Sequence, residues 1–275
     1  MSWAVARRSA SFLIGGALTA LVLGTALVAL VWTPHNPGRI AMARRLQGPS
    51  AAFWLGTDHF GRDVLSQIMV GAQNTLVVAV VAVLLGAAAG VLVGLVAAAA
   101  RGWIEEGLMR ACDFAYAFPA VLLAVVIAAL LGVGGTTTVL AIAVFTVPVF
   151  ARLARAAAIE VWARDFVTAA RADGRGPAHI TVRHVLPNVA GILIVQASTQ
   201  IALAIVVEAG LSYLGLGLQP PATSWGKMLS DAQTHMARAP FLAVFPGLAI
   251  ATAVLGFNLL GDGVRDLLDP RLRRA

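Results

Sequence analysis

Five polar side chains within long apolar segments are the places where this sequence could do chemistry. They are Asp113, Gln196, Gln200, Glu208 and Asn258. Polar groups are costly inside a membrane and mark ion pathways, solute paths or helix contacts. Asp113 and Glu208 could carry a coupling ion, as in a secondary transporter, but both lie near the ends of their segments. The two glutamines and Asn258 could line a path of modest polarity that releases its solute, or could hydrogen-bond to neighbouring helices.

Enzymatic chemistry finds little support in the sequence. An intramembrane hydrolase would need a Ser-His, paired-Asp or His-Glu-x-x-His arrangement at membrane depth, and every His lies in a polar connection. His179 and His184 are five residues apart and do not share a helical face, which argues against a metal site. No Gly-x-x-x-x-Gly-Lys-Ser/Thr loop occurs, so we expect no ATP hydrolysis by this chain. The sequence predicts a protein that is not an enzyme and binds no metal or cofactor of its own.

Composition places the chain in a membrane. Its 275 residues are 59% hydrophobic and 12% charged, with a mean hydropathy of +0.85. This is too apolar for a soluble domain and fits a polytopic membrane protein in contact with lipid. The isoelectric point near 11.1 could indicate nucleic-acid binding, but the positive charge is spread over the connections without an aromatic-basic stripe. The single cysteine, Cys112, excludes an intrachain disulfide.

Six segments have about the length that a helix needs to cross a bilayer. They cover residues 12–32, 74–100, 107–131, 137–157, 189–209 and 241–261. The fold class predicted is all-α, with a first helix and outer loop in residues 1–72, a transmembrane core in 73–262 and a tail in 263–275. In the second segment Gly86, Gly90 and Gly94 recur every four residues. This spacing predicts the close approach of another helix, either within the chain or from a second subunit.

The placement of Lys and Arg predicts the orientation. With six spans both termini share a side, and fourteen of the 20 basic residues fall on that side, five of them being Arg7, Arg8, Arg271, Arg273 and Arg274. Positive charge is retained in the cytoplasm. We therefore expect both termini, and the polar connection 158–188, to face the cytoplasm.

The connection 158–188 is a polar, basic island between the fourth and fifth spans. Residues 161–172 read as a helix, and Asp173-Gly174 supplies a stop signal. Pro177 suits the first turn of a second short helix, which Pro187 is expected to end before the next span begins at Asn188. The pattern predicts a helix, a sharp turn and a short helix lying across the membrane face. An ordinary amphipathic surface loop is the alternative.

This connection resembles the cytoplasmic coupling segment of ATP-binding-cassette (ABC) importer permeases. Ala169-Ala170, Gly174 and Leu186-Pro187 carry the match, while Thr168 stands where the family often has Glu and His184 where it often has Ile. The resemblance implies that the segment docks on an ATPase subunit. The residues that it assigns to this contact are Ala169, Ala170, Gly174, His179, Arg183, His184, Leu186 and Pro187.

Three further stretches resemble the permeases of dipeptide, oligopeptide and nickel importers. They are residues 55–66 in the first outer loop, residues 204–229 at the end of the fifth span, and residues 245–248 with 257–271 in the last span and tail. Together with the connection they cover most of residues 55–273. The resemblance implies the architecture of a type I ABC importer permease and a pore for peptides. Nickel or a nickel chelate is the alternative solute, and a secondary transporter is a remote alternative because no internal repeat is visible.

These motifs suggest roles for several of the residues within them. Asp58, Arg62 and Asp63, together with Trp225, could contact a docking protein on the outer side, and the first three could instead pair with one another. Glu208 lies inside a recognised motif and is expected to shape the outer gate. Gly261-Asp-Gly263 is expected to end the sixth helix, with Asp262 capping a short tail helix.

The resemblance also implies partner proteins. They are a second, homologous permease subunit that forms a heterodimer with this chain, two ATPase subunits that use ATP and magnesium, and a periplasmic or lipid-anchored solute-binding protein. The expected location is the inner membrane. ATP-driven closure of the ATPases would push the connection 158–188 and tilt the fifth helix.

Overall fold

The structure is a computed structural model that describes residues 10–268 and is almost entirely helical. The helices are α2 (Ala10–Val28), α3 (Val64–Ala100), α4 (Gly102–Ala117), α5 (Ala120–Leu131), α6 (Gly135–Trp162), α7 (Asp165–Ala172), α8 (Pro177–Ile180), α9 (Leu186–Tyr213), α10 (Trp225–Ala232) and α11 (Phe241–Leu268). No β-strand occurs in these residues, which confirms the predicted fold class. The terminal arginines used to predict the orientation lie outside the described part of the chain.

Helices α3 and α6 form the centre of the bundle through a ladder of glycines. A Cβ atom on Gly86 would lie 2.6 Å from the carbonyl oxygen of Ala143, and Gly90 and Gly94 face the next two turns of α6 in the same way. Only glycine permits this approach of two helix backbones. The repeated glycines therefore serve packing within the chain, and α9 then packs against both central helices and α11.

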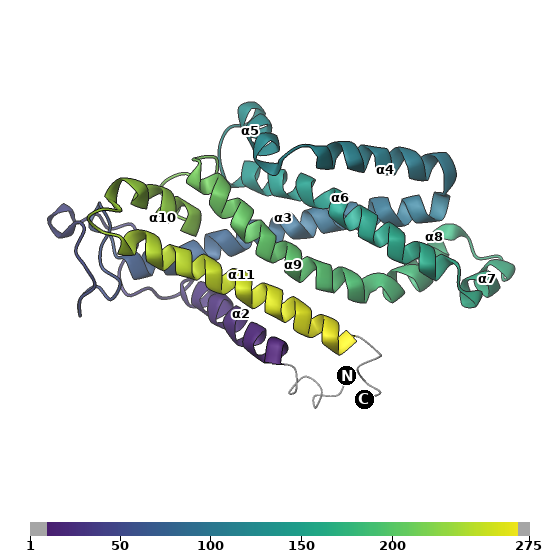
Figure 1. The fold of residues 1–275 in the computed structure, drawn as a ribbon, viewed down its shortest axis with the longest axis horizontal. Coiled ribbons are helices and arrows are strands. Elements are labelled where there is room, and N and C mark those ends of the chain that lie inside the picture. Colours follow the sequence, from purple (N-terminus) through teal and green to yellow (C-terminus); the bar gives the residue numbers. More distant parts are fainter. Residues whose placement is uncertain (1–9, 269–275) are drawn as a thin grey trace.

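Helices α2 and α11 lie side by side along one flank of the bundle (Figure 1). Gly15 of α2 lies against the backbone of Leu259 and Leu260, and Gly256 of α11 lies against Thr19. Small residues on facing surfaces thus allow the first and the last of the described helices to pack closely.

The expected end of the last helix at Gly261-Asp-Gly263 is wrong, because α11 continues to Leu268. Gly261 faces the side chain of Ser198 in α9, and Gly263 faces the backbone of Phe12 in α2. These two glycines allow close approach on two sides of α11 and do not stop it. Asp262 between them is exposed within the helix and caps no separate tail helix in the described residues.

The third span, which the sequence predicted as a single segment over 107–131, is bent. Helices α4 and α5 meet at an angle of 90° across Phe118-Pro119. Phe118 is extended (φ −84°, ψ 127°), as expected for the residue before a proline, because the proline ring disfavours the helical conformation there. In residues 10–268, five single helices are long and apolar enough to cross a membrane, and counting the bent pair as one span gives six.

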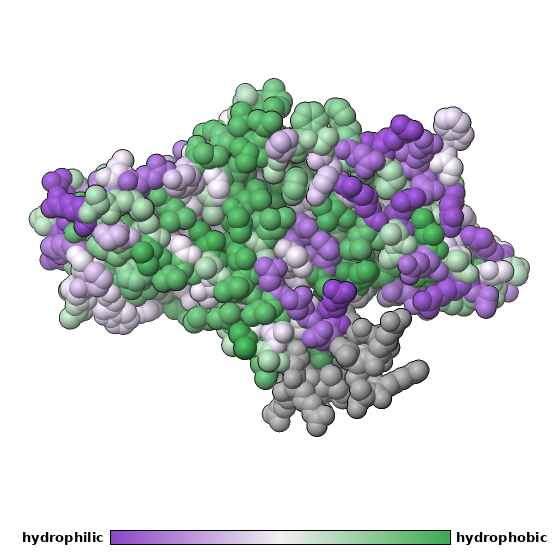
Figure 2. Space-filling model, in the orientation of Figure 1, coloured by the Kyte–Doolittle hydropathy of each residue, from purple (hydrophilic) through white to green (hydrophobic). Residues whose placement is uncertain are grey.

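On the face that Figure 2 shows, apolar side chains cover the middle of the molecule, and hydrophilic residues gather towards both ends. Leu21, Leu84, Leu92, Leu122 and Leu130 are among the large hydrophobic residues exposed. An apolar surface of this extent indicates a lipid environment, in which helices satisfy their backbone hydrogen bonds internally. Loop 29–63 and α10 form one end of the molecule, and α7 and α8 form the other (Figure 1).

Candidate coupling segment, outer loop and solute path

The turn after α7 is a glycine cap of the kind that the sequence predicts. The backbone N–H of Gly174 donates to the Arg171 carbonyl (3.0 Å), and that of Arg175 donates to the Ala170 carbonyl (3.1 Å). Gly174 has φ +79°, in the left-handed region that favours glycine. These two bonds form a Schellman motif. The chain reverses here, so that α7 and α8 form a helix-turn-helix at the molecular surface.

The helix that begins at Pro177 does not end at Pro187, contrary to the sequence prediction. Residues Thr181–Val185 form a π-helical segment that joins α8 to α9. A proline ring inside a regular α-helix crowds the carbonyl four residues earlier and leaves it without a donor. The wider π turn relieves that crowding, and Pro187 lies two residues after its end. One helical rod of 37 residues therefore runs from Pro177 to Tyr213.

Buried side chains hold the surface segment on the bundle. Val167 of α7, Ile180 of α8 and Val185 of the π segment are all buried. The Arg171 guanidinium lies 4.9 Å from the ring centroid of Trp162, at the end of α6. Cation–π contact and apolar burial thus fix the segment to α6 and α9.

The residues predicted to contact an ATPase divide by exposure. Ala169, Gly174, His179, Arg183 and Pro187 are exposed, His184 and Leu186 are half-buried, and Ala170 is buried. The rings of His179 and His184 lie 6.3 Å apart, because the π segment places them near each other. No group of three or more His, Cys, Asp or Glu side chains in residues 10–268 is arranged to hold a metal ion.

At the opposite end, Asp58 organises the loop that leads into α3. Its carboxylate accepts hydrogen bonds from the backbone N–H groups of Phe60 and Arg62 (both 2.8 Å) and from Arg62 Nε (2.6 Å). It also accepts one from Gln67 Nε2 at 2.8 Å. Charge-assisted bonds of this kind are the stronger ones in proteins. The Asp58–Arg62 pair is therefore internal, as one of the two sequence hypotheses held.

Asp63 caps the same helix. Its carboxylate accepts from the Ser66 N–H (2.9 Å) and the Ser66 hydroxyl (2.6 Å), which extends α3 ten residues beyond its predicted start. Asp58 and Asp63 are both buried and so shape the loop from inside. The exposed side chains at this end include Trp54 and Phe60.

His59 lies where this loop meets α10. Its ring stacks on that of His235 with 5.2 Å between centroids. Partial burial lowers the pKa of His59 below 6.5, and Arg62 and His235 act in the same direction, while Asp58 and Asp231 oppose them. The neutral ring is thus the form that this contact favours.

Trp225 is buried at the start of α10, with an exposed fraction of only 2%, so its side chain is not on a docking surface as the sequence interpretation held. Its Nε1–H donates to the Ile68 carbonyl (3.0 Å) and its backbone N–H donates to the Thr75 hydroxyl (3.3 Å). Both contacts tie α10 to α3. A tryptophan whose N–H has a partner can be buried without penalty.

Glu208 lies near the end of α9, close to the start of α10, and is fully buried. Its Oε1 accepts a hydrogen bond of 2.6 Å from Ser212. Gly226, the second residue of α10, lies against the backbone of Ala209. The structure thus places Glu208 inside the junction of α9 and α10, and not on an open surface of the chain. The other residues predicted for a path or gate, Gln196, Gln200 and Asn258, are half-buried or buried in α9 and α11.

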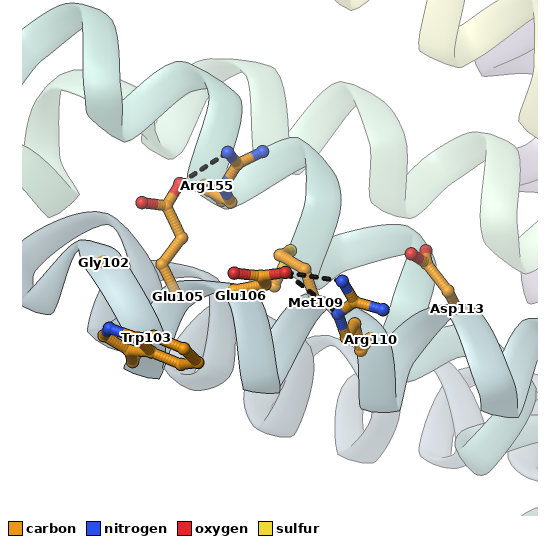
Figure 3. Close-up of a pocket in the computed structure, with 8 residues that line it drawn as sticks. All are labelled: Gly102, Trp103, Glu105, Glu106, Met109, Arg110, Asp113 and Arg155. Atoms are coloured by element: carbon orange, nitrogen blue, oxygen red, sulfur yellow. Dashed lines mark hydrogen bonds and ion pairs between the residues drawn. The ribbon is translucent and has the colours of Figure 1, made fainter.

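The sequence interpretation missed a polar face shared by α4 and α6. We define this α4–α6 polar face as Glu105, Glu106, Arg110, Asp113, Arg152 and Arg155. Glu105 and Arg155 are 2.5 Å apart across the two helices, and Glu106 pairs with Arg110 at 2.6 Å within α4 (Figure 3). The signal was present as charges three to five residues apart, but the predicted span began at residue 107 and left two of the acids in a loop.

These features define a class of protein. It is a helical integral membrane protein whose bundle carries a helix-turn-helix at one end and, at the other, a loop held in place by internal hydrogen bonds. The family model described as "Binding-protein-dependent transport system inner membrane component" matches residues 90–274. The chain belongs to this family of ABC importer permeases of the inner membrane.

Individual relatives agree with the family. The glutathione transport system permease protein GsiD of Pectobacterium atrosepticum is 40% identical over 259 residues, which cover 94% of this chain and 86% of that protein. GsiD of Escherichia coli is 43% identical over 226 residues, or 82% and 75% of the two chains. An inward-facing structure of the MetNI methionine ABC transporter has a TM-score of 0.63 at 18% identity, over 74% of this chain and 97% of that one. This last likeness confirms the fold.

Proposed function

We propose that this permease forms one half of a pore that imports small peptides, including tripeptides of the size of glutathione. The support comes from the relatives at 40% and 43% identity, which are named as glutathione permeases. A second permease subunit, two ATPases and a solute-binding protein complete the importer. The chain itself contributes the path and the docking surfaces.

We further propose that the α7–α8 end faces the cytoplasm and docks on an ATPase. The observation that carries this proposal is the helical rod Pro177–Tyr213, which joins the surface segment to α9 without a break. A push on α8 would therefore tilt α9 as a unit. Glu208, Ser212 and the start of α10 lie at the far end of this rod, so the same tilt would open or close the outer gate.

The decisive experiment is uptake by the whole importer in proteoliposomes. The chain is reconstituted with the permease, ATPases and binding protein encoded beside it, and ATP-dependent uptake of glutathione, a dipeptide and Ni²⁺ is compared. We expect uptake of the peptides and none in the presence of a non-hydrolysable ATP analogue. Uptake of Ni²⁺ alone would replace the proposed solute, and uptake without ATPase subunits would overturn the importer mechanism.

A further inference from the structure

Five of the six residues of the α4–α6 polar face line a pocket that the coupling segment and the outer gate leave unexplained, and Arg152 lies beside it, next to Asp113. The pocket has a volume of about 620 Å³ and is lined from Gly102 and Trp103 to Asp113 on α4, with Arg155 entering from α6. Figure 3 shows the carboxylates of Glu105 and Glu106 and the guanidinium of Arg110 along its wall. The volume is within the range of pockets that hold small organic solutes.

Part of this face lies at the depth of the hydrocarbon core. Residues 75–100 of α3, beside α4, are apolar over about 39 Å, which exceeds a core of about 30 Å by only some 9 Å. Asp113 is eleven residues along α4 from Gly102, or about 17 Å. Asp113 and its neighbour Arg152 therefore lie within the bilayer.

The charged groups at that depth are nevertheless exposed. The side chains of Asp113 and Arg110 are 64% and 77% exposed, and that of Arg152 is 44% exposed. A lipid chain cannot solvate such groups, so they must face water or another subunit. By contrast, Leu130 on α5 is 78% exposed and apolar, as expected for a residue that faces lipid.

The positive and negative charges of this face are equal in number, but its ion pairs differ in how closely they are held. Three carboxylates and three guanidinium groups give the face a formal net charge of zero. Glu105–Arg155 is a close pair at 2.5 Å, whereas Asp113 and Arg152 are 3.7 Å apart and Arg152 rests 4.4 Å from the Tyr116 ring centroid. Asp113 and Arg152 can therefore give up their contact with each other, and each can bind a group of opposite charge on a solute. A face with no net charge offers no net attraction to a bare metal cation.

We propose that the α4–α6 polar face lines the inner, water-filled part of the solute path and binds zwitterionic peptides. The ammonium group of the peptide faces Asp113 and its carboxylate faces Arg152, and the exposed Glu106–Arg110 pair opens so that each partner adds a contact to the peptide group of opposite charge. Weak, two-signed contacts of this kind hold a peptide without trapping it. This proposal rests on the proposed function and assigns its solute class to named residues.

Cysteine accessibility in the reconstituted importer tests the proposal. In a Cys112→Ala background, Asp113→Cys and Glu106→Cys are treated with a charged, membrane-impermeant thiol reagent, with dialanine or S-methylglutathione as the transported probe. We expect both variants to react, and a saturating amount of probe to slow the reaction several-fold. Leu130→Cys is the matched control and should react only with a lipophilic maleimide.

The outcomes separate this proposal from the proposed function. Peptide uptake together with unreactive Asp113→Cys and Glu106→Cys, or with their crosslinking to the second permease, would make this face a subunit interface and overturn only the present inference. Each variant keeps the other carboxylate, so reaction of both variants without protection by either peptide would overturn peptide binding at the face. Absence of uptake of every peptide by the unsubstituted importer would overturn the proposed function and the zwitterion assignment with it.

Discussion

The side chain of Gln67 donates a hydrogen bond of 2.8 Å to the carboxylate of Asp58, nine residues earlier in the chain. Gln67 belongs to α3 and Asp58 to the loop before it, and both are buried. The same carboxylate accepts three further hydrogen bonds from the loop. Asp58 is thus the residue through which the loop end is fixed to the central helix.

Replacement of Asp58 by Ala should destabilise the end of the molecule that is formed by loop 29–63 and α10. Buried donors lose their acceptor, and each such loss costs about 1–3 kcal/mol. We expect Asp58→Ala to lower the free energy of unfolding by at least about 2 kcal/mol, measured as a lower midpoint of thermal unfolding in detergent. Arg39→Ala, at an exposed position of the same loop, is the control and should leave the midpoint unchanged. Equal midpoints for the two variants would contradict the role of Asp58.

Replacement of Gly90 by Ala should weaken the α3–α6 contact. A Cβ atom there would meet the carbonyl oxygen of Val147 and the Cβ of Phe150. Overpacking of this kind typically costs about 1–3 kcal/mol. The matched control is Gly24→Ala in α2, where a Cβ would meet nothing within 4 Å, so alanine should be neutral or slightly stabilising. Thermal unfolding of both variants provides the comparison. A Gly90→Ala protein as stable as the control would contradict the claim that glycine is required for the close approach of α3 and α6.

The glycine ladder and the stop at Gly174 could be predicted from sequence because each depends on local spacing and backbone conformation. The passage of the helix through Pro187 could not, since it depends on a π turn whose Val185 is held by the core. The burial of Trp225 depends on Ile68, which is 157 residues away in the chain.

The α4–α6 polar face was hidden for a different reason. Glu105 and Glu106 lower the local hydropathy, so a search for apolar spans excludes them even though they belong to the same helix as Asp113. The contacts that reveal the face join α4 to Arg152 and Arg155, about forty to fifty residues later. A search for apolar residues finds helices that face lipid and misses helical turns that carry charge.

Substitution of Gly174 by Val tests the coupling segment. A β-branched residue at φ +79° is strained by about 1–2 kcal/mol, so the turn between α7 and α8 should shift. We expect membrane insertion to remain, while the ratio of peptide imported to ATP hydrolysed falls several-fold. Gly176→Ala is the control, because Gly176 is extended (φ −73°) and a Cβ there meets nothing within 4 Å. Normal uptake per ATP in Gly174→Val would remove the argument that this turn transmits force.

A pH titration tests the contact of His59 with α10. Burial lowers the pKa of His59 in the folded protein, so between this value and 6.5 the unfolded chain binds more protons than the folded one. The contribution of His59 to stability is therefore complete above pH 6.5 and falls as the pH drops through that value. We expect the unfolding midpoint to decrease between pH 7.5 and 5.5, and His59→Gln to decrease less over the same range. Measurement of both proteins at pH 8, where the ring is neutral in either state, separates the lost packing from the lost proton linkage. A decrease of the same size in both proteins would show that His59 is not the group that titrates.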